Sequence, residues 1–192
     1  MSEQEPPRVL IVVGDAAETL DTLYPYYRVQ EEGWRPVVAG PERRRYHMVM
    51  HEAPEGWDLT REWEGYTIHA EVAFRDVRAA DYLGVYYSGG RAPEYLRYDP
   101  ELLRLTREFF ALDKPVGLVC HGVEIPAHAG CLQGRRVATV PKCRAEVETA
   151  GATFVDEACV VDGKLVSGRT YHDHGAWCGA WIRSLRSSAD ET

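Results

Sequence analysis

A thiol and an imidazole stand side by side at the end of an apolar run, where both could take part in chemistry. Residues 115–119 read Pro-Val-Gly-Leu-Val and are followed by Cys120, His121 and Gly122. If the run is a strand and the next residues open a helix, Cys120 occupies the strand-to-helix elbow at which hydrolases carry a nucleophile. Helix N-terminal amides would then lower the thiol pKa and could hold an oxyanion. The alternative is a buried cysteine that packs as a small hydrophobic residue.

Two other expected strand ends carry residues suited to the same site. One is Gly14-Asp15 with Glu18 nearby, and the other is Ser88-Gly89-Gly90, whose glycines let a backbone approach a ligand closely. Ligand sites in open α/β sheets lie beyond the carboxyl ends of the strands, so these two segments and Cys120 are expected in one crevice. This convergence of an acid, a glycine turn and a thiol favours a functional Cys120.

Residues near the C-terminus offer groups that could bind a metal. Residues 172–174 read His-Asp-His, and Cys178 follows His174 at the spacing of one helical turn, which would suit zinc. No further ligand pair accompanies these residues. We therefore expect a helix start with His174 lining a pocket, no metal and no other cofactor.

The elements that would position these residues follow from apolar patterning. Short continuous apolar runs closed by glycine or polar residues predict buried strands, and apolar spacing of three and four residues predicts helices. The expected strands are 8–13, 34–39, 82–87, 115–119 and 136–140, with a hairpin at 160–166 and a small antiparallel pair at 46–50 and 66–69. The expected helices are 19–31, 99–112, 123–129, 145–150 and 176–186. This alternation predicts a mostly parallel sheet with helices on both faces.

Composition limits the class of protein. The 192 residues fit one domain, expected at 8–186 between flexible ends at 1–7 and 187–192. A net charge of -8 without a basic block argues against nucleic acid as a partner. Five cysteines without paired spacing favour a reducing compartment. With an acidic N-terminus and no apolar run near the ~20 residues of a membrane span, we expect a cytoplasmic protein without a membrane partner.

With these segments in hand, the chain resembles the ThiJ/PfpI superfamily, which includes the PfpI-type intracellular cysteine peptidases and the parkinsonism-associated deglycase. The likeness runs from about residue 8 to 185 and depends on the order and spacing of several motifs. They are GDAAE at 14–18, GGRAPE at 89–94, KPV at 114–116 leading to CHG at 120–122, AGCLQGR at 129–135, VDGKLVSGR at 161–169, and DH at 173–174 before AW at 176–177. The resemblance implies a flavodoxin-like three-layer sandwich with a mostly parallel sheet, related to class I glutamine amidotransferases.

The resemblance also implies roles for residues at matching positions. Cys120 is the nucleophile at a strained elbow, and His121 follows it as in the peptidase branch. Glu18 matches the acid whose protonated carboxyl contacts the thiolate. The glycine pair Gly89 and Gly90, with the amide of His121, looks like the oxyanion hole.

A carboxylate from a neighbouring subunit orients the histidine in the peptidase-like members. Residues 71–77, EVAFRDV, resemble the segment that carries it and put Asp76 in that position. An acid from another chain implies a homo-oligomer, at least a dimer, with a hexamer as the larger option. Aspartate in place of the usual glutamate shortens the reach of the side chain.

Other positions depart from the family pattern or extend the pocket. Ser88 replaces the usual proline before the glycine pair, and its hydroxyl either points into the site or ties the turn to its backbone. Ser88, Arg91 and His174 are candidate substrate-pocket residues. Residues 43–63 carry no strong family signature, so their part in substrate choice or assembly stays open.

Three hypotheses share these residues. In the first, Cys120 adds to a small reactive carbonyl such as methylglyoxal while Glu18 and His121 move protons, as in a glyoxalase or deglycase. In the second, the protein is a peptidase or amidase with a peptide substrate and His121 as general base. In the third, it is a redox or stress sensor in which a low-pKa Cys120 is oxidised.

Overall fold

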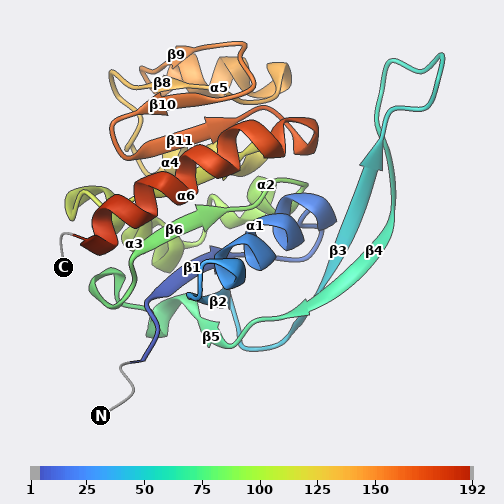
Figure 1. Cartoon of the computed structure of the whole chain (residues 1–192). Coiled ribbons are helices and arrows are strands. Elements are labelled where there is room, and N and C mark those ends of the chain that lie inside the picture. Colours follow the sequence, from blue (N-terminus) through green and yellow to red (C-terminus); the bar gives the residue numbers. More distant parts are fainter. Residues whose placement is uncertain (1–4, 191–192) are drawn as a thin grey trace.

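A seven-stranded sheet runs through the middle of the protein in the computed structural model, which describes residues 5–190 (Figure 1). From edge to edge the strands are β10 (Val160–Asp162), β11 (Leu165–Gly168), β7 (Val116–Val119), β6 (Gly84–Tyr87), β1 (Arg8–Val12), β2 (Arg35–Gly40) and β5 (Val72–Ala73). Every pairing is parallel except that of β10 with β11. The predicted mostly parallel α/β sheet is therefore confirmed, and it is consistent with a flavodoxin-like fold.

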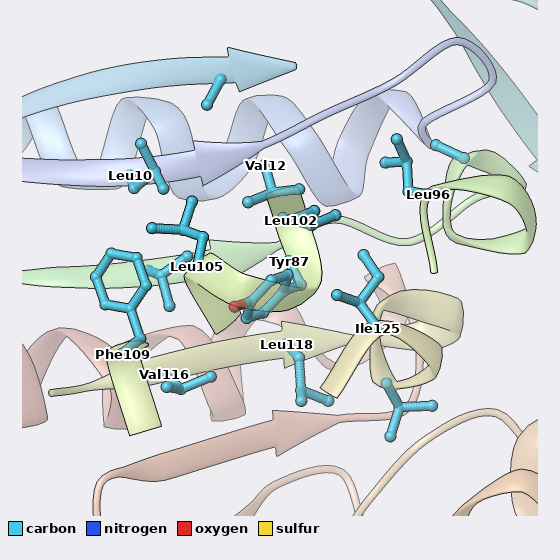
Figure 2. Close-up of a cluster of buried hydrophobic side chains, with 14 of the residues drawn as sticks. Leu10, Val12, Tyr87, Leu96, Leu102, Leu105, Phe109, Val116, Leu118 and Ile125 are labelled. Atoms are coloured by element: carbon cyan, nitrogen blue, oxygen red, sulfur yellow. The ribbon is translucent and has the colours of Figure 1, made fainter. Parts of the chain in front are cut away.

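The central strand β1 is buried on both faces, as its continuous apolar run predicts. On one face Leu10 packs with Leu105 and Phe109 of α3 (Pro100–Ala111), and Figure 2 shows this cluster from the side. On the other face, Val9 and Ile11 belong to the apolar cluster built on α6 (His174–Asp190) and α1 (Thr19–Glu31). Helices on both sides thus close a three-layer core.

A side-chain cap fixes the start of α3. Asp99 caps α3 by accepting hydrogen bonds from the amides of Glu101 at 2.9 Å and Leu102 at 3.1 Å. The other helical segments are α2 (Ala92–Leu96), α4 (Glu124–His128), α5 (Arg144–Thr149) and the 3₁₀ turns η1 (Phe74–Asp76), η2 (Ala79–Asp81), η3 (Cys120–Val123), η4 (Pro141–Cys143) and η5 (Tyr171–Asp173). Within residues 5–190, none of the helices has the length and apolarity to cross a membrane.

A long hairpin leaves the body of the protein beyond β2 (Figure 1). It consists of β3 (Arg45–Glu52) and β4 (Arg61–His69), which pair antiparallel with Tyr46 opposite Ile68. The predicted antiparallel pair is confirmed, although both strands are longer than the apolar patterning indicated. The reason is that their outer halves are largely exposed, so they carry no apolar periodicity.

Two sequence-based boundaries are wrong. The expected strand 136–140 shrinks to β8 (Arg136–Val137), which pairs with β9 (Thr153–Phe154) in a separate small sheet. Beyond Val137 the chain bonds elsewhere, since the Ala138 amide donates to Ser167 Oγ at 3.0 Å. The expected flexible end at 187–192 is also too long, because α6 continues to Asp190 with Leu185 and Ser188 buried. Residues 1–4 and 191–192 of the expected flexible ends lie outside the described residues.

Candidate active site

Cys120 lies at a strained elbow between β7 and the turn η3. Its φ is 55°, in the left-handed region that costs a non-glycine residue roughly 1–2 kcal/mol. The turn passes close to the end of β6, where a Cβ on Gly122 would come within 2.5 Å of the Tyr87 carbonyl oxygen. Thr139 Oγ1 donates to the Cys120 carbonyl at 2.6 Å and fixes the elbow from the other side. The predicted strand, elbow and helix are therefore confirmed.

Backbone amides meet the Cys120 sulfur from two segments. The amides of Gly90 and His121 hydrogen-bond to the thiol and act to lower its pKa. Gly90 has a φ of 81°, which favours glycine, and Gly89 leaves room beside Cys120 because a Cβ there would lie 2.6 Å from Cys120 Cβ. These are the residues for which the sequence suggested an oxyanion hole, and that role stays a prediction.

The pKa of the Cys120 thiol is shifted opposite to the sequence-based expectation. Burial of the sulfur and, after it, the negative charge of Asp21 raise that pKa to about 12, against the effect of the two amides. The expected lowering relied on a helix N-terminus, but η3 is a single 3₁₀ turn of four residues. Cys120 is thus a neutral thiol at rest, and any reaction at the sulfur needs a base to remove its proton.

Asp21 is an acid beside the sulfur that the sequence analysis missed. It is 1% exposed, and a Cβ on Gly89 would overlap both the Asp21 carboxyl group and Cys120 Cβ. Burial, followed by the charge of Glu18, raises the pKa of Asp21 well above its ordinary value. Asp21 therefore resists ionisation beside the sulfur. Its place three residues after Glu18, on the same helical turn, is the signal that could have revealed it.

His174 forms the buried partner of Asp21. Its Nε2 lies 3.3 Å from Asp21 Oδ1, and Trp177 Nε1 donates to its Nδ1 at 3.0 Å. An indole nitrogen is only a donor, so the remaining ring proton of His174 is on Nε2, toward Asp21. Burial lowers the pKa of His174 to about 4. Burial thus disfavours the charged form of both members of this pair.

Glu18 caps α1 and reaches the same site. Its Oε2 accepts a hydrogen bond from the Asp21 amide at 2.6 Å. Burial raises the pKa of Glu18 to about 7, although that hydrogen bond acts in the opposite direction. A carboxyl group with a pKa near neutrality can both give and take a proton under working conditions.

His121 has a carboxylate partner within its own chain. Its Nδ1 lies 2.8 Å from Oε1 of Glu124, a residue of α4 whose side chain is 3% exposed. Arg97 Nη1 stands 3.2 Å from the other oxygen, Oε2, of the same carboxylate. The sequence analysis did not single out Glu124, although the spacing of three residues on one helical turn could have indicated it.

Asp76, the residue expected to orient His121 from a neighbouring subunit, lies elsewhere. It lines a separate cavity of about 430 Å³ with Arg8 and Arg35, the first residues of β1 and β2. Asp76 thus lies beside the amino ends of β1 and β2, whereas Cys120 follows the carboxyl end of β7, so the two residues stand at opposite ends of the strands of the sheet. Within one chain Asp76 therefore does not reach His121, and its role across a subunit boundary stays a prediction.

A cavity of about 640 Å³ opens in front of Cys120 and His121. Its other lining residues are Glu18, Asp21, His51, Glu52, Ala53, Thr60, Gly90, Arg91, Glu94, Val140, Lys142, Thr170, Tyr171 and His172. Four of these come from residues 51–60 at the outer end of the long hairpin, and Tyr171 anchors this end by donating to the His51 carbonyl at 2.9 Å. The segment 43–63, which had no assigned part, thus supplies one wall of the cavity.

The three residues suggested for the substrate pocket separate in the structure. Arg91 lines the cavity. Ser88 is buried behind the glycine pair, where its Oγ lies 2.7 Å from Thr22 Oγ1. His174 is buried behind Asp21 and stacks on Tyr24. Among the described residues, neither Ser88 nor His174 belongs to the cavity lining.

Comparison with known proteins covers nearly the whole chain. The sequence profile of the DJ-1/PfpI family matches residues 7–184. A protein of Pyrococcus abyssi named a deglycase is 33% identical over 179 residues, which are 93% of this chain and 99% of that protein. A protein of Thermococcus kodakarensis, also named a deglycase, is 34% identical with the same coverage of 93% and 99%. A solved ThiJ/PfpI domain protein from Brachyspira murdochii has a TM-score of 0.82 at 19% identity over 96% of this chain and 99% of its own, a likeness of fold.

Proposed function

The chain belongs to the DJ-1/PfpI family, and from this premise we propose that it is a cysteine-dependent enzyme that acts on small reactive carbonyls, of the glyoxalase or deglycase type. The observation that carries the proposal is Cys120 at a strained elbow, with two amides at its sulfur and a histidine–carboxylate pair beside it in an open cavity. The deglycase names of the two archaeal relatives support the choice of carbonyl chemistry.

The first step is addition of the thiol to an aldehyde carbon. Because the pKa of Cys120 is about 12, the proton leaves as the bond forms, and His121 takes it. Glu124 at 2.8 Å accepts the Nδ1 proton of His121, which leaves Nε2 free to act as the base. The new sulfur–carbon bond sends the carbonyl electrons to oxygen, and the amides of Gly90 and His121 stabilise that oxyanion.

Glu18 then moves a proton between the two carbons of a 2-oxoaldehyde. With a pKa of about 7 it removes the proton from the carbon bound to sulfur and returns one to the neighbouring carbon, which converts the hemithioacetal into a thioester. Water hydrolyses the thioester to a 2-hydroxy acid and restores the Cys120 thiol, so methylglyoxal and water together give lactate. Burial disfavours a second negative charge at Asp21, beside the sulfur.

The cavity favours a substrate larger than a free three-carbon aldehyde. Its volume of about 640 Å³ lies in the usual range for pockets that enclose drug-sized ligands, roughly 300–1,000 Å³. Lys142 on its lining offers positive charge to a carboxylate, and Arg91, paired with Glu94 at 3.3 Å, lies on the same lining. We therefore propose adducts of 2-oxoaldehydes with amino acids or amino-acid side chains as the substrate class.

The other two hypotheses draw less support from the site. A redox sensor needs a thiolate at rest, whereas the pKa of Cys120 is raised to about 12. A peptidase or amidase would use the same Cys120 and His121, so only its substrate distinguishes it from the proposed enzyme. A homo-oligomer in a reducing, cytoplasmic setting stays part of the proposal, with Asp76 as the residue offered to a neighbouring subunit.

The proposal is tested with purified protein, methylglyoxal and an adduct of methylglyoxal with an acetylated amino acid. We expect lactate in both reactions, saturation with the adduct when free aldehyde is scarce, and a loss of at least about 10³-fold in Cys120→Ser. Cys131→Ser, a partly buried thiol that does not line the cavity, is the matched control and should keep full activity. Equal rates in Cys120→Ser and Cys131→Ser would refute a Cys120-dependent reaction.

Fluorogenic peptides separate the peptidase hypothesis. The proposal predicts that their hydrolysis disappears during extensive purification while lactate formation remains. Peptide turnover that survives purification and is abolished by Cys120→Ala would favour the peptidase or amidase instead.

A further inference from the structure

His121, Glu124 and Cys143 bring three different metal-binding groups to one point behind the cavity. One ring nitrogen of His121, one carboxylate oxygen of Glu124 and the sulfur of Cys143 all lie within 4.8 Å of one another. Glu124 is 4% and Cys143 is 1% exposed, and the Cys143 sulfur stands 3.7 Å from Glu124 Oε1. The three groups come from η3, α4 and η4, three consecutive helical segments packed behind the elbow.

The combination of donors selects the kind of ion. Zn²⁺ binds imidazole nitrogen, thiolate sulfur and carboxylate oxygen, and three protein ligands leave a fourth position for water. Mg²⁺ and Ca²⁺ prefer oxygen ligands and would leave the thiol and the imidazole unused. The cluster therefore fits Zn²⁺ better than the hard divalent cations.

Charge around the cluster also favours a cation. Glu124 and Glu146 both act on the Cys143 sulfur with their negative charge, and Arg97 faces both carboxylates, at 3.2 Å from Glu124 Oε2 and 2.5 Å from Glu146 Oε1. One positively charged guanidinium thus faces two negatively charged carboxylates. Glu124 Oε2 is buried, and among the described residues no donor meets it with hydrogen-bond geometry. A buried acceptor in that condition is costly, and a bound cation would relieve it.

An ion can reach the cluster from two sides. His121 lines the cavity in front of Cys120, and Glu124 lines a second cavity of about 390 Å³ together with Arg97 and Glu146. The cluster lies in the wall between these two cavities. Two of the three groups thus line a cavity, and Cys143 lies buried beside Glu124.

We propose that His121, Glu124 and Cys143 bind one Zn²⁺ ion and that this ion inhibits the reaction at Cys120. The ion replaces the thiol proton of Cys143, which is released to solvent, and it takes the Nδ1 lone pair of His121 while the ring proton moves to Nε2. His121 then has no nitrogen left to accept the Cys120 proton. Zinc binding stands on the cluster alone, whereas inhibition rests on the proposed function.

Cobalt titration of the full-length protein tests the site. We expect one Co²⁺ per chain, an absorption band from thiolate-to-cobalt charge transfer, displacement of Co²⁺ by Zn²⁺ and no effect of Mg²⁺. Cys143→Ser should remove the band and weaken Zn²⁺ binding by on the order of 100-fold or more. Cys120→Ser and Cys131→Ser are matched thiol controls and should keep both the band and the affinity. Glu124→Gln should keep the band and weaken binding.

The outcomes separate the site from the proposed function. Zn²⁺ should lower kcat/KM of the natural protein at least tenfold and leave Cys143→Ser, which retains Cys120 and His121, unaffected. Loss of the band in Cys120→Ser, or unchanged Zn²⁺ affinity in Cys143→Ser, would overturn the site. A protein that shows the Cys143-dependent band but turns over no carbonyl substrate would refute the proposed function and leave the metal site intact.

Discussion

Two histidine–carboxylate pairs flank the Cys120 sulfur and differ in how far water reaches them. His121 and Glu124 lie 2.8 Å apart on the cavity side, where the His121 side chain is 19% exposed. His174 and Asp21 lie 3.3 Å apart on the side of α1 and α6, where their side chains are 8% and 1% exposed. An imidazole paired with a carboxyl group therefore occurs twice around one thiol, in different surroundings.

Burial explains why the two pairs serve different purposes. Asp21 has no cation beside it among the described residues, so its pKa is raised well above the ordinary value, and the pKa of His174 is lowered to about 4. Glu124, in contrast, has the Arg97 guanidinium 3.2 Å away. The inner pair resists ionisation and builds the wall behind the sulfur, whereas the outer pair meets the cavity, where it could exchange a proton with a substrate.

The largest expected effect comes from breaking the outer pair at its histidine. His121→Gln should lower kcat/KM by about 10³-fold, because the general base is lost, while the melting temperature changes by only a few degrees. Steady-state kinetics and thermal unfolding measure the two quantities. The matched variant His174→Gln should do the reverse, with a melting temperature lower by about 5 °C and kcat/KM within tenfold. Equal losses of activity in the two variants would contradict the division of roles.

Breaking the outer pair at its carboxylate should have the next largest effect. Glu124→Gln is expected to lower kcat/KM by about 10²-fold, because Gln holds the Nδ1 proton of His121 less firmly and stabilises the imidazolium less. Asp76→Asn is the control in the same assay and should be close to the natural protein. If Asp76→Asn shows the large loss instead, the carboxylate that orients His121 comes from a neighbouring subunit.

The pH dependence of stability tests Glu18, the acid on the α1 side of the sulfur. Folded Glu18 keeps its proton up to about pH 7, whereas the unfolded chain releases it near the ordinary value of 4.5. Folding is therefore favoured at low pH, and this contribution is lost as pH rises from about 4.5 to about 7. Relative to Glu18→Gln, the free energy of unfolding of the natural protein should fall by about 3 kcal/mol across that window. Urea unfolding from pH 5 to 8 checks this, and parallel curves would refute it.

The smallest effect is expected where a hydroxyl lies behind the glycine pair. Ser88→Ala removes the contact with Thr22 Oγ1 at 2.7 Å and should lower stability by about 1 kcal/mol with KM unchanged. Arg91→Ala, on the cavity side, should raise KM with little effect on stability. A raised KM in Ser88→Ala would show that its hydroxyl acts on the substrate.

Local patterns predict most of the fold and the position of Cys120 at the elbow. The apolar run of β1, the Asp99 cap and the change from strand to helix at Cys120 are all encoded by neighbouring residues. The strand expected at 136–140 ends early, as β8, because Ala138 and Thr139 hydrogen-bond to Ser167 and to the elbow at Cys120, and these partners are distant in sequence. Tertiary hydrogen bonds replaced strand pairing there.

The acids of the site were harder to infer from sequence. Asp21 reads as an ordinary first-turn acid of a helix and Glu124 as an ordinary helix-start residue, since their burial depends on what packs over them. The predicted lowering of the Cys120 thiol pKa is wrong for a related reason. Burial of Cys120 raises this pKa by more than the amides of a four-residue turn lower it. Motifs located the reactive groups, but their protonation states required the packed structure.

The central claim is that Glu124 acts through His121 on the Cys120 proton, and a double-mutant cycle tests it most directly. The measurement is kcat/KM for His121→Gln, Glu124→Gln and the combined variant on the same carbonyl substrate. The account predicts that the combined variant is no slower than His121→Gln, because Glu124 has nothing left to orient. Losses that multiply in the combined variant would show that the two residues act independently and would contradict the account.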